Sequence, residues 1–448
     1  MDRNRKNKLI KLGADPLADA LIELAVRVEA ADDLIERLIA TPKENIKRYK
    51  SKLADIKCRQ QFISWKESAS FAHELEMLLA DLESGVADPQ TGAELVASFY
   101  QADGDVFDQC DDSGGDVGNV FRFDAKQLFV SYAVQCQDKK WLSELVFELN
   151  REDDYGIRDI LIDCAVEFLP ESMIRYLIDR FQIAASKETD EYKKRHWLLR
   201  VESLARQIKD APLFEKARIA AWGTLSTAAC VDIARVYLES GDAKTALSWM
   251  DRVSPEETFQ TNERDQLLHE IYGVIGDQDQ QVEVAWRIFR RYRSADALTD
   301  LLAVIGDDQS TAVIEGEVTT ILSERTLSCT DARFLVEMAH MDAAETYLFG
   351  RADQLNGDFY SGLLPLAEAM ETTGRHLCAS VIYRALLDSI LRRGRTKAYP
   401  HGVRYLKKLD RFAASVSDWQ RIENHTVYKD HLSQKHGRKH SFWSRYKK

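Results

Sequence analysis

Acidic side chains gather in one short stretch of the chain, between residues 103 and 119. Their oxygen atoms are the ligands that Ca²⁺ and Mg²⁺ prefer. An EF-hand, however, needs glycine at its sixth position, and counting back from Gly114 or Gly115 puts Gln109 or Cys110 at the first ligand position. The EF-hand pattern therefore fails. The oxygen-bearing residues of the stretch are Asp103, Asp105, Asp108, Asp111, Asp112, Asp116 and Asn119.

Three interpretations of this acidic loop stay open. Gly114, Gly115 and Gly118 suit a tight turn in which Asp116 or Asn119 caps the following helix, and this is the interpretation we favour. The same carboxylates suit a surface that a partner contacts, or a divalent metal site in a metal-dependent enzyme. The partner-contacting residues expected in this loop are Asp108, Asp111, Asp112 and Asp116.

Basic and aromatic side chains alternate in the C-terminal part of the chain. Such a tail suits nucleic acid, with cations on phosphates and rings stacked on bases. The alternative, which we favour, is a cap whose aromatic rings cover the open end of a helical array and whose cations meet its acidic body. The candidate partner-binding residues of the tail are Lys407, Lys408, Arg438, Lys439, Trp419, Phe442 and Trp443.

Local signatures of catalysis or cofactor binding are missing from the sequence. His425, His431, His436 and His440 have no cysteine nearby and do not match a zinc-finger or H-E-x-x-H pattern. The chain also lacks G-x-G-x-x-G, G-x-x-x-x-G-K-[ST] and G-x-S-x-G. The sequence therefore gives no support for an enzyme, and we expect no cofactor.

Charge is distributed unevenly along the 448 residues, whose net charge is −12. Residues 392–448 hold sixteen Lys or Arg and four Asp or Glu, a local net charge of +12, so that residues 1–391 carry −24. Residues 81–121 contain ten carboxylates and no Lys or Arg. This asymmetry indicates either an anionic partner for the basic end or the docking of one part of the fold on another.

Sequence features that report on cellular location predict a cytoplasmic protein. The longest uncharged run has 13 residues, at 219–231, whereas a membrane helix needs about 20 apolar residues. The basic N-terminus lacks the apolar core of a secretory signal. The seven cysteines are scattered without a C-x-x-C pair, which favours reduced and mostly buried thiols.

Helix signals run through the chain, and strand signals are nearly absent. Asp15, Thr41 and Asp88 each precede a proline, a pairing typical of a helix N-cap followed by the first helical residue. Ser64 and Glu67 have the spacing of a capping box, which predicts another helix start. We therefore predict an all-α fold.

Turn glycines recur at the period of a paired-helix repeat. Gly241, Gly276, Gly306 and Gly374 follow apolar segments at spacings of 35, 30 and 68 residues, and His340 lies near the midpoint of the long interval. The unit with Ile233-Ala234, Tyr237, Gly241 and Ala246 resembles the tetratricopeptide repeat. We predict an α-solenoid of antiparallel helix pairs, divided into segments 1–140 (helical with the acidic loop), 141–224 (irregular pairs), 225–395 (degenerate tetratricopeptide-like repeats) and 396–448 (basic cap and tail).

Three segments resemble a bacterial family known only as a domain of unknown function, sometimes named together with SWIM-type zinc fingers. They are Phe62-Ile63-Ser64-Trp65, the loop from Asp111 to Phe121, and the tail from Tyr405 to Trp443. The resemblance implies an all-helical bacterial protein and carries no activity.

The function that these features favour is binding. We expect a non-catalytic helical-repeat scaffold that holds an unidentified protein partner in the bacterial cytoplasm, away from membranes. A nucleic-acid-associated regulator that uses the tail is the first alternative. A metal-dependent enzyme that uses the acidic loop is the second.

Overall fold

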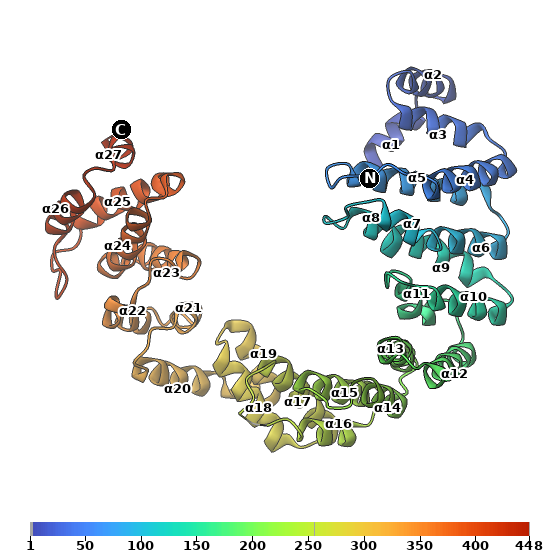
Figure 1. The fold of residues 1–448 in the computed structure, drawn as a ribbon. Coiled ribbons are helices and arrows are strands. Elements are labelled where there is room, and N and C mark those ends of the chain that lie inside the picture. Colours follow the sequence, from blue (N-terminus) through green and yellow to red (C-terminus); the bar gives the residue numbers. More distant parts are fainter. Residues whose placement is uncertain (1–2, 255, 448) are drawn as a thin grey trace. The chain divides into compact units, whose positions relative to one another are not determined.

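Helices make up most of the residues that the computed structural model describes, 3–254 and 256–447 (Figure 1). These ranges contain no named strand, and the bridge between Ile63 and Cys110 stands alone. The chain forms two compact units, Met1–Pro255 (unit 1) and Glu256–Lys448 (unit 2). The all-α prediction is confirmed, whereas the four predicted segments stay a prediction.

Unit 1 is built from helices that pack mainly on their neighbours in sequence, such as α4 on α5, α12 on α13 and α15 on α16. Its helices are α1 (Arg3–Ile10), α2 (Ala14–Ala25), α3 (Glu29–Ile39), α4 (Pro42–Lys57), α5 (Ser68–Gly85), α6 (Pro89–Tyr100), α7 (Asp103–Asp108), α8 (Asp116–Asn119), the π-helix η1 (Val120–Ala125), α9 (Lys126–Gln135), α10 (Lys139–Arg151), α11 (Asp159–Asp163), the 3₁₀ helix η2 (Ala165–Glu167), α12 (Glu171–Lys187), α13 (Glu191–Gln207), α14 (Ala211–Trp222), α15 (Thr227–Glu239) and α16 (Ala243–Met250).

Unit 2 follows the same rule, with α17 on α18, α23 on α24 and α24 on α25. Its helices are α17 (Thr261–Ile275), α18 (Gln278–Arg291), α19 (Ala295–Ile305), η3 (Asp307–Gln309), α20 (Ser310–Ser323), α21 (Cys329–Glu337), α22 (Met341–Gly350), η4 (Ala352–Gln354), α23 (Tyr360–Thr372), α24 (His376–Arg393), η5 (Thr396–Ala398), α25 (Tyr399–Ala413), α26 (His425–His436) and α27 (His440–Lys447). Stacking of consecutive helices is the packing that a solenoid requires, and this prediction is confirmed.

Two of the four predicted helix starts are confirmed. The Thr41 side chain accepts from the Glu44 N–H and forms a capping box with it, and α4 begins at Pro42. The Asp88 side chain accepts from the Thr91 N–H at 2.8 Å, and α6 begins at Pro89. Both caps depend only on neighbouring residues, which is why the sequence reveals them.

The other two predicted starts are wrong. Helix α2 begins at Ala14, so Asp15 lies inside its first turn, and Gly13 takes the N-cap position with φ 88°. Helix α5 begins at Ser68, because residues 64–67 form a separate turn closed by the bond from the Glu67 N–H to the Ser64 carbonyl oxygen. The Ser64 hydroxyl donates to Glu67 at 2.7 Å, so it does not cap the helix.

A recurring C-terminal turn joins the helix pairs. Gly241, Gly276 and Gly374 have φ between 77° and 91°. The N–H of the residue after each glycine donates to the carbonyl of the residue five positions earlier, which is the Schellman pattern. Ala339 and Lys209 form the same turn although neither is glycine, with φ of 61° and 57°. The pattern's bonds run from Asp210 to Ala205, Asp242 to Tyr237, Asp277 to Tyr272, His340 to Leu335 and Arg375 to Met370.

Gly306 departs from this pattern. Its φ and ψ are 103° and 138°, outside the left-handed helical region, and the chain continues into the short helix η3. The predicted turn therefore exists at 306 but has a different geometry. The likeness of these pairs to tetratricopeptide repeats stays a prediction.

Glu215 of α14 ties this helix to the next pair. The Tyr237 hydroxyl donates to its carboxylate at 2.6 Å, and the buried Trp249 indole N–H donates to the same oxygen at 3.2 Å. Beside it, Arg218 forms an ion pair of 2.6 Å with Asp232. One acidic residue therefore joins α14 to both α15 and α16.

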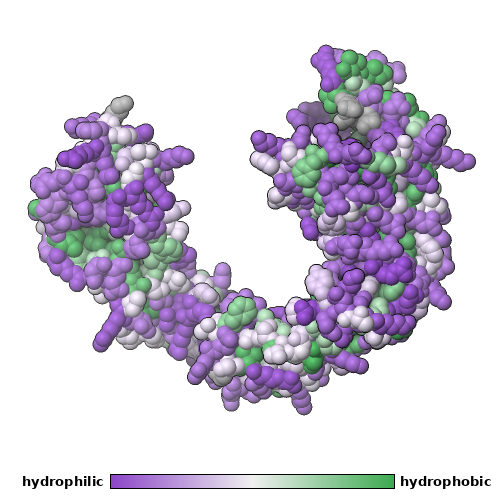
Figure 2. Space-filling view, in the orientation of Figure 1, coloured by the Kyte–Doolittle hydropathy of each residue, from purple (hydrophilic) through white to green (hydrophobic). Residues whose placement is uncertain are grey.

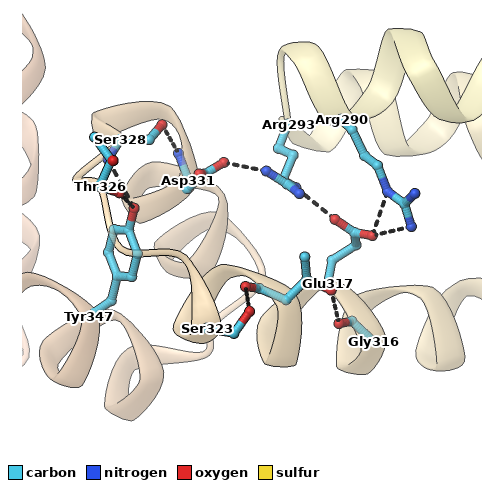
Figure 3. Close-up of polar contacts among 10 residues, drawn as sticks. Arg290, Arg293, Gly316, Glu317, Ser323, Thr326, Ser328, Asp331 and Tyr347 are labelled. Atoms are coloured by element: carbon cyan, nitrogen blue, oxygen red, sulfur yellow. Dashed lines mark hydrogen bonds and ion pairs between the residues drawn. The ribbon is translucent and has the colours of Figure 1, made fainter.

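A buried ion-pair network joins α20 and α21 to the end of α18 (Figure 3). Arg293 is 8% exposed and donates to Glu317 at 2.7 Å and to Asp331 at 2.8 Å. Arg290, with a side chain 54% exposed, reaches the other oxygen of Glu317 at 3.0 Å. Three charged groups with almost no access to water therefore satisfy one another.

The cysteines and the membrane prediction can also be compared with the structure. All seven cysteines are free; Cys58 is exposed, Cys329 is half-buried and the other five are buried, as predicted. In the described parts of the chain, no helix is both long and apolar enough to cross a membrane.

Candidate functional site

The acidic loop is fastened to the segment that precedes α5. The Ile63 N–H donates to the Gln109 carbonyl at 2.7 Å, and the Asp111 N–H donates to the Ile63 carbonyl at 2.9 Å. On either side of this bridge, the side chains of Phe62 and Trp65 are 61% and 62% exposed. The loop and two exposed aromatic rings thus belong to one stretch of surface on unit 1.

Inside the loop, the carboxylates hold the turn together. Asp112 accepts from the N–H groups of Val117 at 2.9 Å and Gly118 at 2.8 Å, which caps the start of α8. Asp111 accepts from the N–H and the hydroxyl of Ser113, and this hydroxyl bond lowers the pKa of the Asp111 carboxyl. Gly115 supplies the left-handed conformation with φ 77°. The predicted structural turn is therefore present. The residue that caps the helix after it is Asp112, so the prediction that Asp116 or Asn119 would be this cap was wrong.

The two remaining acidic candidates are exposed. Asp108 accepts a hydrogen bond from the Tyr155 hydroxyl, which raises the pKa of that tyrosine. Asp116 accepts from the Ser68 hydroxyl at 3.3 Å. Within residues 3–254 and 256–447, no group of three or more His, Cys, Asp or Glu side chains is arranged to hold a metal ion.

The aromatic side chains of the tail are packed into unit 2. Phe442 is fully buried and makes edge contacts with Tyr399 and Trp443. The half-buried Trp443 donates its indole N–H to the His436 carbonyl at 3.0 Å. Trp419, also half-buried, lies against the Arg384 guanidinium. These rings have the packing of a cap, and a fully buried Phe442 is closed to a stacking base.

The four candidate cations of the tail have different environments. Lys408 donates to Glu371 and, at 2.7 Å, to the Tyr383 hydroxyl. Burial acts to raise the pKa of Glu371, yet the hydrogen bonds from Lys408 and Tyr383 outweigh it and hold this pKa below its usual value. Lys407 and Arg438 are exposed, and Lys439 is half-buried near Gly394. Lys408 therefore has a structural partner, whereas Lys407 and Arg438 face solvent.

An apolar surface on α1–α3 was missed by the sequence reasoning. Helix α2 has no buried residue, although it packs on α3. Figure 2 shows hydrophobic side chains gathered over α2. The apolar spacing of α2 was visible in the sequence, but the same spacing also describes a helix that is covered by its own chain. The large apolar residues exposed here are Leu9, Ile10, Leu12, Ile22, Leu24, Val26, Val28, Leu38 and Ile39.

Comparison with known proteins identifies a family for this chain, whereas the match to a solved structure is weak. Among solved structures, the chain is similar to a circular tandem repeat protein with novel repeat topology and enhanced subunit contact surfaces. The identity is 13%, the match covers 96% of this chain and 98% of that chain, and the TM-score is 0.17, too low to carry an argument. No curated protein matches the chain.

The family model is the informative match. The model of a family of unknown function (DUF6880) matches twice in tandem, over residues 3–221 and 220–445. Together these two matches span nearly the whole chain, which confirms the resemblance to a family of unknown function. The chain belongs to the DUF6880 family.

Proposed function

We propose that this protein is a non-catalytic helical scaffold that binds a protein partner through the apolar surface of α1–α3. The observation that carries the proposal is the exposure of nine large apolar residues between Leu9 and Ile39. Apolar surface in contact with water costs roughly 25 cal/mol per Å², and apolar side chains that gather on an exposed surface, as Figure 2 shows over α2, mark an interaction site.

The compartment belongs to the same proposal. Seven free cysteines suit a reducing environment, and on that ground we place the protein in the cytoplasm. The nucleic-acid alternative has less support, because the rings that would stack on bases pack against the body of unit 2.

Affinity capture with matched surface variants tests the proposal. The variant Ile22→Gln/Leu24→Gln changes two side chains that are 57% and 49% exposed, so folding should be unaffected. Val274→Gln, which alters a 65% exposed valine of α17 in unit 2, is the control. We expect the wild type and the control to retain one stoichiometric protein partner after nuclease treatment, and the double variant to lose it.

Two outcomes would contradict this function. Equal recovery of the partner by the double variant would show that α2 is not the binding surface. Recovery that disappears with nuclease, together with a steep loss of binding as salt is raised, would favour the nucleic-acid alternative.

A further inference from the structure

The apolar surface of α1–α3 carries charges of both signs beside its apolar side chains. Only Lys11, Leu12 and Gly13 separate α1 from α2, and α2 packs on α3, so the three helices are close neighbours in unit 1 (Figure 1). An occupant of this surface has to match its charges as well as its apolar residues.

Cations lie next to the apolar residues of α1. Lys6 precedes Leu9 by three residues and Ile10 by four, and residues at these spacings are neighbours on the surface of a helix. Leu9 and Ile10 are 50% and 63% exposed. The exposed cations of this segment, none of which forms an ion pair with another described residue, are Arg5, Lys6, Lys8 and Lys11.

Carboxylates lie next to the apolar residues of α2 and α3. Asp15 and Asp19 are one helical turn apart on α2, and Asp19 precedes the 57% exposed Ile22 by three residues. Glu23 continues this row but is already paired with Arg27 at 2.9 Å. The exposed carboxylates that form no ion pair with another described residue are Asp15, Asp19, Asp32 and Glu36.

A surface of this kind is complementary to a second copy of itself. In a dimer with two-fold symmetry every contact occurs twice, so cations of α1 in one copy can meet carboxylates of α2 in the other copy, and the reverse. The exposed apolar residues of both copies are then removed from water. A lipid surface or a nucleic acid suits this surface less well, because its carboxylates would meet phosphate groups of the same sign.

We propose that two copies of this chain dimerise through α1–α3, with α1 of each copy against α2 of the other. This inference rests on the proposed function, because it names the protein that covers the apolar surface. A stable interface takes about 20–30 residues from each partner, and residues 3–39 supply that number. Their nine large apolar side chains are between 43% and 84% exposed.

Sedimentation velocity of the purified full chain, over a range of concentrations, tests the dimer. We expect the wild type to reach twice the mass of one chain, and Ile22→Gln/Leu24→Gln to raise the dissociation constant at least tenfold. The control Lys187→Glu/Lys193→Glu reverses the charge of two exposed lysines on α12 and α13, and it should associate like the wild type.

Charge reversal tests which helices meet. Lys6→Glu/Lys8→Glu and Asp15→Lys/Asp19→Lys should each weaken their own dimer at least tenfold, because the reversed side chains then face like charges. An equimolar mixture of these two variants should dimerise again, since both contacts between α1 and α2 then join opposite charges. Recovery in the mixture also shows that both variants are folded.

Three results would overturn the dimer. They are a wild type that stays monomeric at every concentration, unchanged association of Ile22→Gln/Leu24→Gln, and a mixture of the charge variants that associates no better than either variant alone. A monomeric wild type leaves the proposed function intact if affinity capture still retains another protein that depends on Ile22 and Leu24. If capture retains no such protein, the proposed function fails together with the dimer.

Discussion

Replacing Arg293 by methionine should destabilise unit 2 far more than the same change at Arg290. Both arginines bind Glu317, but Arg293 is 8% exposed and also holds Asp331. Methionine keeps most of the side-chain volume and removes the charge. Removing one partner of a buried ion pair costs about 3–5 kcal/mol, because a charge is left without compensation in a site closed to water.

Arg290→Met is the matched control, because it removes a guanidinium from the same carboxylate. Its side chain is 54% exposed, and pairs at such positions contribute about 0–1 kcal/mol. The two variants therefore separate the effect of burial from the effect of losing an arginine next to Glu317. The expected difference in the free energy of unfolding is several kcal/mol.

Hydrogen exchange read by mass spectrometry is the suitable assay. The chain contains two compact units, so a whole-chain melting curve need not be two-state. Peptides from α20 and α21 report the opening of the network directly, since they carry Glu317 and Asp331. Equal loss of protection in the two variants would refute the argument that burial sets the cost.

Three further predictions test individual features. Hydrogen bonds from Arg393 and Ser389 lower the pKa of Asp358 to about 2. The ionised Asp358 should therefore stabilise the fold fully above the unfolded-state pKa of about 4, and this stabilisation should be lost as pH falls through 2. The difference in melting temperature between wild type and Asp358→Asn should shrink over the same pH range. Iodoacetamide should label the exposed Cys58 first and Cys378 only on unfolding, because burial raises the pKa of Cys378 to about 12; mass spectrometry of the labelled peptides gives the order. Ala339→Gly should stabilise unit 2 and Gly276→Ala should destabilise it, each by about 1 kcal/mol, because both positions have positive φ. Urea unfolding measures both effects, and a destabilising Ala339→Gly or a stabilising Gly276→Ala would refute the reasoning.

The features that the sequence predicted correctly depend on residues close together in the chain. The caps at Thr41 and Asp88 and the turns at Gly241, Gly276 and Gly374 are of this kind. The residue types at these positions favour these conformations without the help of contacts from distant parts of the chain.

The features that sequence reasoning missed depend on distant contacts. Ala339 and Lys209 adopt the left-handed conformation because the packing of their helix pairs imposes the turn, and their residue types give no sign of it. Asp112 is the exception, because its bonds to Val117 and Gly118 span only five and six residues; they were missed because an N-cap ordinarily lies two or three residues before the N–H groups that it accepts from. Arg384 contacts the Trp419 ring and donates to the Glu423 carbonyl, which lies 39 residues further along the chain. No spacing rule within one helix reports such an arrangement.

The bonds made by Glu215 decide where the chain can be divided for expression. The two family matches meet at residues 220–221, inside α14, and a cut there would separate Glu215 from Tyr237 and Trp249. The first fragment would keep the Glu215 carboxylate without its two hydrogen-bond donors. The second would begin near α15 and lack most of α14, the helix on which α15 packs. A fragment that ends at Pro255 keeps α14, α15 and α16 together. The two family matches and the two compact units therefore have different borders, and a cut after Pro255 preserves contacts that a cut at 220–221 would break.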